Sequence, residues 1–490
     1  MRKIVLISFY PGFFGINLRL LGACLIKAGF CVEYLHLGYA NYKFGERTPT
    51  LLNFCFSKII TDNILNKIRN SLFVGISLAS SEFIAARDFT IALKKVVNTT
   101  VVWGGPHPTA SFEGCVRYAD YVCIGEGEET IVDIANLLNE EKSIEHVQNL
   151  AYMKNGIIHV NQKREVIKDL DSLPIPDTEI YLHNVFINGE LRKITPELLL
   201  DIDRIYIRPV PESVVYTAIV SRGCPNRCSY CNNSYLNRIY QGQKYFRYRS
   251  LNHLFMEIHQ ALTDIKQIGA VFFADDNLTA LPNEVLFEFA RRWTKEVGIP
   301  FGTSGSPSTI TDYKIKILAE TGLLYKFGVG IESGSQRMID LYNRKETIQQ
   351  SIKAINIVEK YREQFYQKHE KPVINYQFIF DNPYETNKDL STTIRFILNY
   401  IKDPKSLTVF SLVIYPGSEI YIQSKKDKIF SIDKNIYQES FIELKPTFVK
   451  IWIALYRRGL PKWILRLLAA QIIFNILNSK ICIKLYRKMF

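Results

Sequence analysis

The chain has 490 residues, of which 47% are hydrophobic and 22% are charged, and its formal net charge is +13. These proportions are ordinary for folded proteins, so they exclude a largely disordered chain, and the length suffices for about two to four domains. The positive excess favours an anionic partner, whether nucleic acid, a membrane surface or a phosphorylated substrate, but it does not choose among them.

The first residues and the cysteines indicate the compartment. The opening MRKIVLISFYPG breaks at Pro11 and Gly12 with no small-residue cleavage site after it, so we expect no secretory signal. The nine cysteines are an odd number scattered over a long chain, unlike a disulfide framework. We therefore expect a reducing, cytoplasmic location. Six cysteines stand singly in apolar surroundings and are expected to be buried thiols: Cys24, Cys31, Cys55, Cys115, Cys123 and Cys482.

From residue 3 to about 140, short runs rich in β-branched residues alternate with stretches of helical periodicity. Amphipathic helices are expected at 17–29 and 83–97. This alternation is typical of a doubly wound α/β domain, in which ligands bind beyond the carboxyl ends of the parallel strands. The buried strands are expected at 3–10, 31–37, 72–79, 100–105 and 121–127.

Loops rich in glycine or hydroxyl residues follow four of these strands. A dinucleotide would require GxGxxG directly after the first strand, and Gly12 and Gly15 do not have that spacing. We expect a site for a large ligand that is flat or carries phosphate; tight turns alone are the alternative interpretation. The loops are YPGFFG (10–15), SLASS (77–81), GGPHPT (104–109) and GEGEET (125–130).

The first loop, GGPHPT and GEGEET together resemble the cobalamin-binding domain that precedes the radical SAM core in a large group of enzymes. The resemblance covers residues 1–140. The Asp-x-His-x-x-Gly element by which other cobalamin domains ligate cobalt is absent from the first loop, YPGFFGINLRL, so the resemblance implies cobalt without that histidine. Taken alone, His107 would more often be a hydrogen-bonded loop residue than a ligand. The residues implied in cobalamin binding are Ser77, Gly104, Gly105, His107, Thr109, Gly125, Glu126 and Gly127.

Residues 141–214 are expected to connect this domain to the next one. LDSLPIPD (170–177) contains Pro174 and Pro176, which cannot continue a helix. We therefore interpret this stretch as a surface loop within a connector.

Three cysteines stand at spacings of four and three in SRGCPNRCSYCNNS, residues 221–234. A strand is expected just before them, and the Pro-Asn pair between the first two cysteines favours a loop. Cys224, Cys228 and Cys231 can then wrap one side of a metal centre, and thiolates suit zinc or iron–sulfur clusters. A structural zinc site requires four ligands, and the chain has no second CxxC and no HxxxH. The zinc interpretation is therefore the weaker one.

Three thiolates on a four-iron cluster would leave one iron open for a reactant. CPNRCSYC is CxxxCxxC with an aromatic residue before the last cysteine, and it resembles the radical SAM signature. The resemblance implies a [4Fe-4S] cluster on Cys224, Cys228 and Cys231, with S-adenosylmethionine (SAM) on the open iron and Tyr230 beside the adenine. Electron transfer from the cluster to SAM would then give a 5′-deoxyadenosyl radical.

Residues 215–420 repeat a strand-then-helix pattern that resembles the partial (β/α)6 barrel of the radical SAM core. Polar residues again follow the strands. Asp275 and Asp276 close the second strand, where helix capping is the alternative role. GVGIESGSQ (328–336) resembles the family's fourth strand, which with the strand end at Asp275 implies SAM contacts from Asp275, Glu332 and Ser333. After the first strand at 217–221, strands are expected near 270–276, 301–306, 326–334, 373–381 and 406–417.

Two turns near the end of this region match the family pattern to different degrees. FIFDNPYET (378–386) stands where the family has FxxGxPxET, with Asp381 and Asn382 in place of the usual apolar-glycine pair. IYPGSE (414–419) matches the proline-glycine turn that closes the sixth strand. The first turn is therefore a departure from the family next to the implied SAM pocket.

Residues 421–490 are expected to form a basic, mainly helical region. After residue 445 there are nine lysines and arginines and no acidic residue. WILRLLAAQIIFNIL (463–477) is apolar, but Arg466 interrupts it and it is too short to span a bilayer. It is expected either to cover the open end of the barrel or to lie in a membrane surface or grip a lipid-like substrate.

The resemblance implies an enzyme that couples cobalamin to radical SAM chemistry, with methylation of an unactivated carbon of a small-molecule or lipid-like substrate as the leading reaction. No catalytic residue is assigned, and an electron donor such as flavodoxin or ferredoxin is implied. A cyclisation, ring rearrangement or oxidation with the same cofactors is the first alternative. An RNA methylthiotransferase would need three further N-terminal cysteines and an RNA-binding barrel at the C-terminus, so nucleic acid is not an expected partner. A non-catalytic cobalamin or iron sensor is the remaining alternative.

Overall fold

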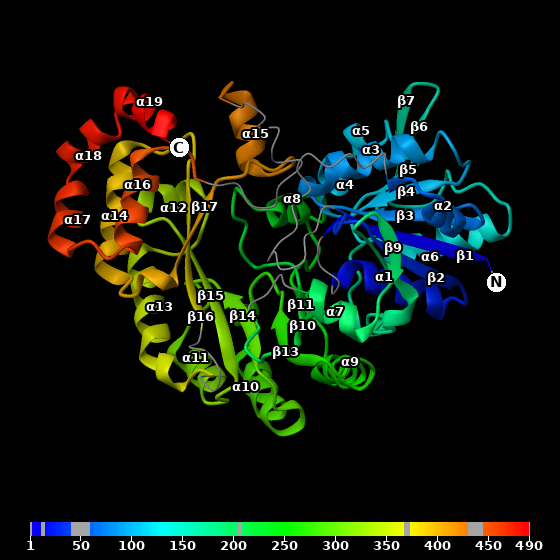
Figure 1. Cartoon of the computed structure of the whole chain (residues 1–490), viewed down its shortest axis with the longest axis horizontal. Coiled ribbons are helices and arrows are strands. Elements are labelled where there is room, and N and C mark those ends of the chain that lie inside the picture. Colours follow the sequence, from blue (N-terminus) through cyan, green and yellow to red (C-terminus); the bar gives the residue numbers. More distant parts are fainter. Residues whose placement is uncertain are drawn as a thin grey trace.

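The computed structural model describes residues 2–10, 15–40, 59–203, 208–366, 373–429 and 444–489. A nine-stranded N-terminal sheet and a six-stranded parallel sheet stand side by side, and a group of helices lies at the far end of the second sheet (Figure 1). The expected fold class, a Rossmann-like domain followed by a partial barrel and a helical C-terminal extension, is confirmed.

The N-terminal sheet has the strand order β7-β6-β5-β4-β3-β1-β2-β8-β9. Its centre, from β5 to β8, is parallel, and the outer strands β6, β7 and β9 pair antiparallel. The strands are β1 Lys3–Ser8, β2 Cys31–His36, β3 Ser71–Ser77, β4 Val101–Gly104, β5 Tyr121–Cys123, β6 Leu150–Lys154, β7 Ile157–Val160, β8 His183–Ile187 and β9 Glu190–Lys193.

Helices cover both faces of this sheet because its central strands are apolar on both sides. In β1, Ile4 and Leu6 pack against α1 and α6, whereas Val5 and Ile7 pack against α2 and α3 on the other face. This is the doubly wound arrangement that the sequence predicts. The helices are α1 Ile16–Lys27, α2 Asp62–Ile68, α3 Phe83–Leu93, α4 Pro106–Ala110, α5 Phe112–Cys115 and α6 Glu128–Asn139.

The segment 141–214, expected as a connector, is more ordered than predicted. It contributes the four strands β6 to β9, which extend both edges of the N-terminal sheet, and the helix α7 Pro196–Ile202. Val185 and Ile187 of β8 are fully buried. The short apolar run around them is the signal that the connector interpretation missed.

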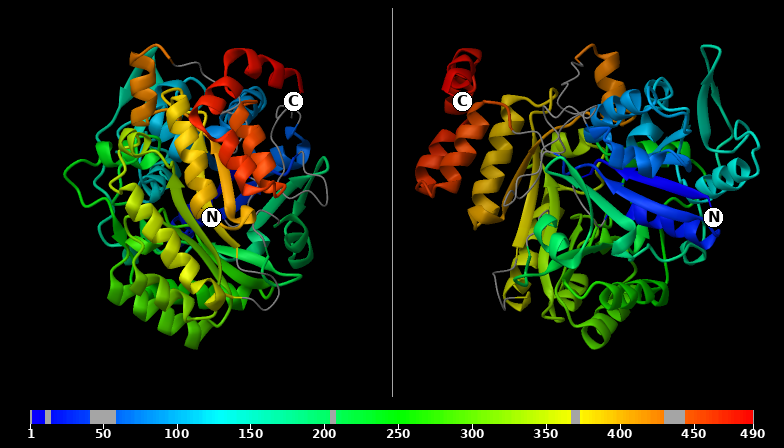
Figure 2. Two further views of the ribbon diagram at one scale, coloured as in Figure 1. Left: turned by 90° about the vertical axis from the view of Figure 1, so that its left-hand side faces the viewer. Right: turned by 45° about the vertical axis from the view of Figure 1, so that its right-hand side comes forward.

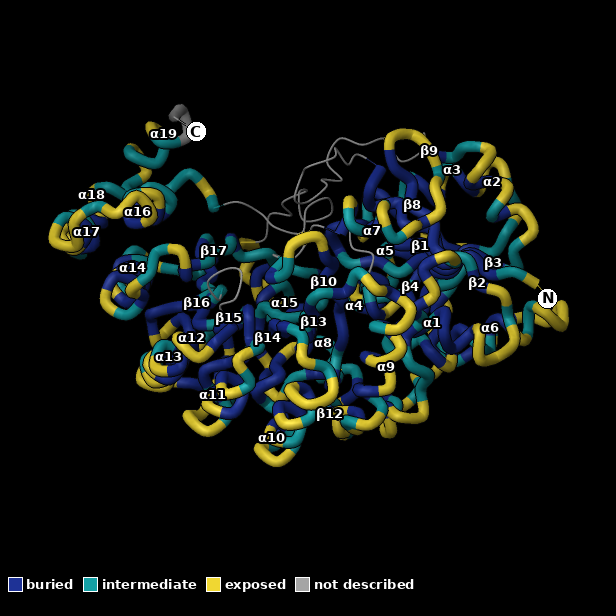
Figure 3. Tube along the Cα trace, turned by 60° about the horizontal axis from the view of Figure 1, so that its bottom comes forward, coloured by how far each residue is buried: buried dark blue, intermediate teal, exposed yellow. Residues whose placement is uncertain are grey.

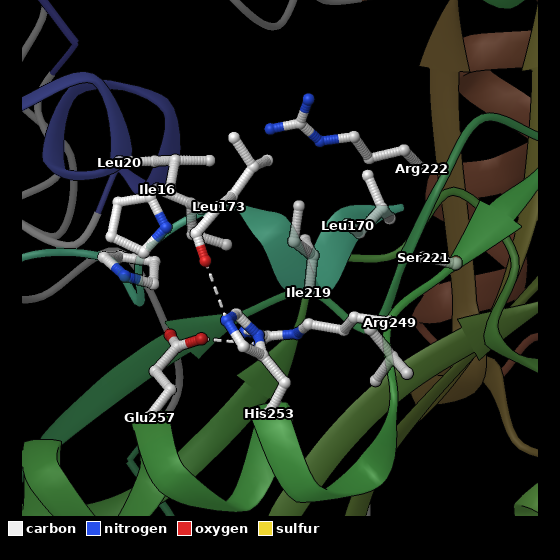
Figure 4. A pocket seen from close by; sticks show the side chains of 13 residues that line it. Ile16, Leu20, Leu170, Leu173, Ile219, Ser221, Arg222, Arg249, His253 and Glu257 are labelled. Atoms are coloured by element: carbon white, nitrogen blue, oxygen red, sulfur yellow. Dashed lines mark hydrogen bonds and ion pairs between the residues drawn. The ribbon is translucent and has the colours of Figure 1, made fainter. Parts of the chain in front are cut away.

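The proline-containing stretch within this segment packs between the two units and is not a surface loop. Pro176 is buried, and Leu173 accepts a hydrogen bond at its carbonyl oxygen from His253 Nε2 at 2.9 Å. These residues and the ion pair between Arg249 and Glu257 surround a small cavity of about 30 Å³ beside α1 (Figure 4). The stretch therefore helps to fix the N-terminal unit against the barrel.

The barrel sheet is parallel throughout and keeps its strands in chain order. Hydroxyl side chains begin several of its helices: Thr347 and Thr386 form capping boxes at α13 and α14. The strands are β10 Val214–Ala218, β13 Ile268–Phe273, β14 Phe301–Gly305, β15 Leu324–Glu332, β16 Val373–Phe380 and β17 Leu407–Ser411. The helices are α8 Asn232–Ile239, α9 Leu251–Asp264, α10 Asn283–Arg292, α11 Asp312–Ala319, α12 Gln336–Leu341, α13 Ile348–Tyr361 and α14 Asn387–Tyr400.

A short antiparallel pair outside the barrel sheet encloses the cysteine segment. The strands β11 Ser221–Arg222 and β12 Arg247–Tyr248 pair with each other, and the three cysteines and α8 lie between them in the sequence. Both ends of the cysteine segment are thereby held at one place beside the barrel.

Of the helices in the C-terminal region, α17 and α18 pack against α14 on the outside of the barrel (Figures 1 and 2). Residues 463–477 form two helices that meet near Ala469 and do not cover the open end of the barrel; Ser391 of α14 donates to Ala469 O at 2.9 Å. No helix in the described ranges is long and apolar enough to cross a membrane. The helices are α15 Glu419–Lys426, α16 Phe448–Arg457, α17 Lys462–Leu468, α18 Gln471–Leu477 and α19 Lys480–Met489.

The isolated cysteines are only partly as expected. Cys24, Cys115 and Cys123 are buried, and burial raises the pKa of each of these thiols to about 12. Cys31 is exposed, because it is the first residue of β2 and its side chain lies outside the sheet core, so that expectation was wrong. Cys482 is half-buried, and Cys55 lies outside the described residues.

The barrel core contains an aromatic cluster beneath α10. The ring of Phe289 lies 5.2 Å from Phe273, 5.4 Å from Trp293 and 5.6 Å from Phe301, measured between ring centroids. Most of the residues along the strands in this region are buried (Figure 3). Phe289 therefore joins the helix to three neighbours at once.

We expect Phe289→Ala to lower the free energy of unfolding by about 3–5 kcal/mol, because it removes a buried ring and leaves a cavity. The matched control is Phe287→Ala in the same helix, whose side chain is 50% exposed; it should cost less than about 1 kcal/mol. Denaturant unfolding followed by circular dichroism measures both values. Equal effects of the two substitutions would show that the cluster does not stabilise the barrel.

Candidate active site

A cavity of about 720 Å³ lies between the two units, where the carboxyl ends of the strands of both sheets meet. The N-terminal unit lines it with the loops after β3, β4 and β5, and the barrel lines it with the cysteine segment and α8. Tyr230 and Cys231 reach it from the second side. Seven of the eight residues implied in cobalamin binding line it: Ser77, Gly104, Gly105, Thr109, Gly125, Glu126 and Gly127.

One end of this cavity is an apolar slot between the sheet and the helices α1 and α6. Leu6, Val102, Ile131 and Ile134 line the slot. Gly75 lies at its floor, and a Cβ atom there would stand 2.8 Å from Leu6 Cδ2. The cavity thus joins a polar, glycine-rich rim to an apolar recess, which suits a large ligand with one apolar end, as cobalamin has.

Two glycines of the rim have positive φ angles and cannot carry a side chain. Gly105 has φ +105°, and its Cβ would lie 2.8 Å from Leu78 O; Gly125 has φ +90°, and its Cβ would lie 2.0 Å from Tyr240 Oη. Gly125 N also donates to Thr109 Oγ1 at 3.1 Å. The two glycine loops are therefore joined by a hydrogen bond. At these two glycines the backbone faces the cavity without a side chain.

His107 does not line the cavity, although it was among the residues implied in cobalamin binding. Its Nδ1 lies 3.0 Å from Ser80 Oγ, its ring packs on Phe83 at 4.8 Å between centroids, and only 3% of the residue is exposed. Burial lowers the pKa of His107 to about 4. The histidine anchors the GGPHPT loop from behind, which is the simpler role that the sequence also allowed.

Glu126 joins the two units through a buried group of charges. Its Oε1 lies 3.1 Å from Arg222 Nη1 and 2.7 Å from Arg247 Nη2, and Arg222 also pairs with Glu128. Burial alone would raise the pKa of Glu126, but the hydrogen bond from Arg247 and the charge of Arg222 outweigh it and lower the pKa. Glu126 borders the cavity, and its carboxylate is engaged with the barrel.

Of the three cysteines of the segment, Cys231 lines the cavity. Burial, with smaller contributions from the charges of Asp276 and of the neighbouring thiols, raises the pKa of Cys224 to about 11 and that of Cys231 to about 12. Among the described residues no three His, Cys, Asp or Glu side chains are grouped to hold one metal ion. In a four-iron cluster each thiolate binds a different iron, so the thiols must surround a wider space. Cys224, Cys228 and Cys231 are the residues that would hold that cluster.

Tyr230 and Glu332 meet at a buried guanidinium that the sequence did not single out. Tyr230 Oη donates to Glu332 Oε1 at 3.0 Å, and Arg344 Nη1 donates to Tyr230 Oη at 2.7 Å and to Glu332 Oε1 at 3.0 Å. Burial raises the pKa of Glu332 although Arg344 opposes the shift. Glu332 ends β15 with φ 65°. Its strained backbone and paired carboxylate fix Tyr230 at the cavity wall.

Of the four residues implied in SAM binding only Tyr230 lines the cavity; Glu332, Asp275 and Ser333 do not. Asp275 is a backbone cap: its Oδ1 accepts from Ser221 N at 2.6 Å and from Val220 N at 3.1 Å. The neighbouring Asp276 lines the cavity instead. Ser333 is fully buried, and its Oγ lies 3.0 Å from Thr393 Oγ1.

The conformation of the turn after β16 explains why its sequence departs from the family pattern. Asp381 has φ 62°, in the left-handed region where glycine is the usual residue. Its Oδ2 accepts from Ser411 Oγ at 2.9 Å and from Lys445 N at 2.8 Å. The aspartate thus ties the turn to β17 and to the start of the C-terminal region, which a glycine could not do.

Several cavity residues were missed by the sequence reasoning. Arg222 stands two residues before the first cysteine of the motif, and its position next to the motif was the available signal. The aromatic stretch after α8 contained no motif that would have identified its members in advance. The missed cavity residues are Arg222, Asn233, Tyr240, Tyr245, Arg247 and Tyr415.

Comparison with known families matches both units. Residues 2–135 match the B12 binding domain, and residues 218–397 match the radical SAM superfamily. A Pyrococcus horikoshii protein named as an uncharacterized methyltransferase is 27% identical over 71% of this chain and 68% of its own length. The anaerobic magnesium-protoporphyrin IX monomethyl ester cyclase of Cereibacter sphaeroides is 22% identical over 86% of this chain. The chain spans 63% of that cyclase.

Solved structures share most of the fold of this chain. The radical SAM methyltransferase TsrM of Kitasatospora setae, with tryptophan and a SAM analogue bound, superposes with a TM-score of 0.63 at 15% identity over 87% of this chain and 76% of its own. The cobalamin-dependent enzyme OxsB, with aqua-cobalamin and SAM bound, gives 0.61 at 17% identity over 89% of this chain and 56% of its own. At identities of 15% and 17%, this similarity shows a shared fold and nothing more.

Gly104→Val is expected to weaken retention of cobalamin about ten-fold or more, because it fills the cavity rim with a side chain. A Cβ at Gly104 would meet only Cys123 Cβ, at 3.7 Å, so the fold should tolerate it. The control is Gly114→Val, whose Cβ would meet Ser111 Oγ at the same 3.7 Å outside the cavity. Visible absorption of the protein after gel filtration reports bound corrinoid. Full retention by the Gly104 variant would argue against this cavity as the cobalamin site.

Glu385 in the turn after β16 should make stability depend on pH. Burial, with the charges of Asp381 and Asp389, raises its pKa from 4.5 to about 8. The folded state therefore holds this proton more tightly, and its contribution to stability is lost as the pH rises from 4.5 towards 8. We expect Glu385→Gln to flatten the fall in unfolding free energy over that window, measured by denaturant titration. The exposed control Glu284→Gln should keep the wild-type slope; a Glu385 variant with that same slope would contradict the assignment.

Proposed function

The chain belongs to the radical SAM enzymes that carry a cobalamin-binding domain, with a [4Fe-4S] cluster, SAM and cobalamin as cofactors, and we propose that it methylates an unactivated carbon of a small-molecule or lipid-like substrate. The observation that carries the proposal is a single cavity lined by both the glycine loops and the cysteine segment. The relative named as a methyltransferase supports it.

The protein's own residues place the reacting groups and exclude water. Bound together, the cofactors supply a methyl group and a carbon radical derived from SAM. Tyr230, fixed by Arg344 and Glu332, forms part of the wall beside the cysteines. The pairing of Glu126 with Arg222 and Arg247 closes the cavity between the units. Fixed geometry of this kind lowers the entropy cost of bringing reactants together.

The substrate is assigned to a second cavity of about 330 Å³ that adjoins the first. The two cavities share six lining residues: Asn17, Leu18, Ser77, Pro106, Ile219 and Ala274. This volume is in the range of small-molecule sites. Of the carboxylates that line the second cavity, Glu82 Oε2 accepts from Ala79 N at 2.6 Å and Asp203 Oδ2 accepts from Val215 N at 3.0 Å. These carboxylates are already engaged, which favours a substrate recognised mainly by shape and apolar contact.

Radical generation requires an external one-electron donor. In the described part of the chain no group of His, Cys, Asp or Glu outside the motif is arranged to hold a second metal centre. A small redox protein such as flavodoxin or ferredoxin is the proposed donor.

A ring-forming or oxidative reaction with the same cofactors is the second candidate. It is favoured by the likeness to the cyclase, which extends over 86% of this chain. An RNA methylthiotransferase is disfavoured, because Cys115 and Cys123 belong to core clusters on opposite faces of the N-terminal sheet. These thiols cannot join a second cluster, and the C-terminal region is helical rather than a small barrel.

The test uses the reduced holoenzyme with methyl-labelled SAM and a small-molecule and lipid extract of the host organism. We expect S-adenosylhomocysteine and 5′-deoxyadenosine to form together, and label to enter a compound of the extract. Mass spectrometry measures all three. Deoxyadenosine with an unlabelled product would overturn methyl transfer in favour of the second candidate, and no cleavage of SAM under any condition would favour a sensor.

Substitution of the motif cysteines provides the control for this experiment. Cys224→Ala/Cys228→Ala/Cys231→Ala should abolish deoxyadenosine, because the cluster loses its ligands. Cys31→Ala changes an exposed cysteine at the start of β2 and should leave both products unchanged. Deoxyadenosine formation that survived the triple substitution would show that the cleavage does not arise at this centre.

A further inference from the structure

The outermost helices of the molecule expose apolar side chains in a regular pattern. Each of α17, α18 and α19 carries one exposed apolar pair, and the two members of each pair stand four residues apart, about one helical turn. The exposed fractions are 69% for Trp463, 53% for Leu467, 77% for Ile472, 62% for Ile476, 75% for Ile481 and 56% for Leu485.

The exposed pairs of α17 and α18 face away from the protein core. Leu465 lies midway between the members of the first pair and is 1% exposed, and Phe474 lies midway in the second and is fully buried. Residues two apart on a helix point about 200° apart. The buried side chains belong to the barrel core, so the pairs point outward. Figures 1 and 3 show the three helices in succession along the outer rim, far from the N-terminal unit.

The same part of the chain holds most of the excess positive charge. Residues 445–490 contain ten lysines and arginines and no aspartate or glutamate, which accounts for ten of the thirteen excess charges. Lys462, Arg466, Lys480 and Lys484 are exposed on these three helices. Apolar and basic side chains are thus interleaved on one rim.

We propose that α17, α18 and α19 form a docking surface for a bilayer that contains anionic lipid. Exposed Trp, Leu and Ile side chains suit the boundary between headgroups and acyl chains, and lysines and arginines are attracted to anionic headgroups. A second copy of this chain would bring the four exposed basic side chains of this face against the same four of its partner, which disfavours self-association through this face. The proposal rests on this surface alone and is independent of the reaction at the cavity.

The test is co-sedimentation of the full-length protein with vesicles of phosphatidylcholine, with and without one quarter phosphatidylglycerol. We expect binding to the anionic vesicles, weaker binding at higher salt, and little binding to phosphatidylcholine alone. Ile472→Ser/Ile476→Ser should weaken binding about ten-fold or more, because it removes apolar area and keeps every charge. Lys480→Gln/Lys484→Gln should weaken it about five-fold for each charge removed.

The matched control is Met256→Ser/Phe287→Ser, which removes two apolar side chains that are 61% and 50% exposed on α9 and α10. This control should bind like the wild type, and circular dichroism should be unchanged in all variants. Equal binding to both kinds of vesicle, no binding to either, or wild-type binding by the Ile472/Ile476 variant would overturn the proposal. So would a dimer, detected by light scattering, that the same substitutions dissociate.

Discussion

The buried contact of Glu126 with Arg222 and Arg247 joins the two units at one site. Glu126 belongs to the loop after β5 in the N-terminal sheet, whereas the arginines belong to β11 and β12, which enclose the cysteine segment. Charges out of water are costly unless they are paired and hydrogen-bonded, and here the carboxylate of Glu126 pairs with both guanidinium groups across the boundary. The contact therefore holds the glycine loops facing the cysteines across one cavity.

A second set of buried polar groups supports the same arrangement below the cavity. Arg19 Nη1 donates to Tyr216 Oη at 2.8 Å, and Tyr216 Oη donates to Glu257 Oε1 at 2.8 Å. Arg19 lies on α1 and the other two residues lie in the barrel. These contacts hold the two units together outside the cavity. The glycine rim and the apolar slot can therefore remain open. The catalytic groups themselves are brought by the cofactors, and the protein supplies their relative position.

The parts of the molecule that follow from local pattern were predictable, and those that depend on contacts between the units were not. The central strands and the cysteine loop follow from periodicity and motif, and the family resemblance points to the N-terminal loops, where seven of the eight implied residues line the cavity. The strands within residues 141–214 were not predicted, because β8 joins the sheet by pairing with β2, which is distant in the sequence. His107 and Asp275 have the right residue types at the right strand ends. Their hydrogen bonds to Ser80 and to the backbone of Ser221, which no motif encodes, turn them away from the cavity.

The central claim is that one cavity of this chain holds cobalamin against the cluster bound by Cys224, Cys228 and Cys231. Electron paramagnetic resonance of the protein with reduced cluster and paramagnetic cobalt tests it most directly. The account predicts one cobalamin for each cluster and a magnetic interaction between the two centres that disappears when cobalamin is removed. Spectra that are the simple sum of two isolated centres would contradict it.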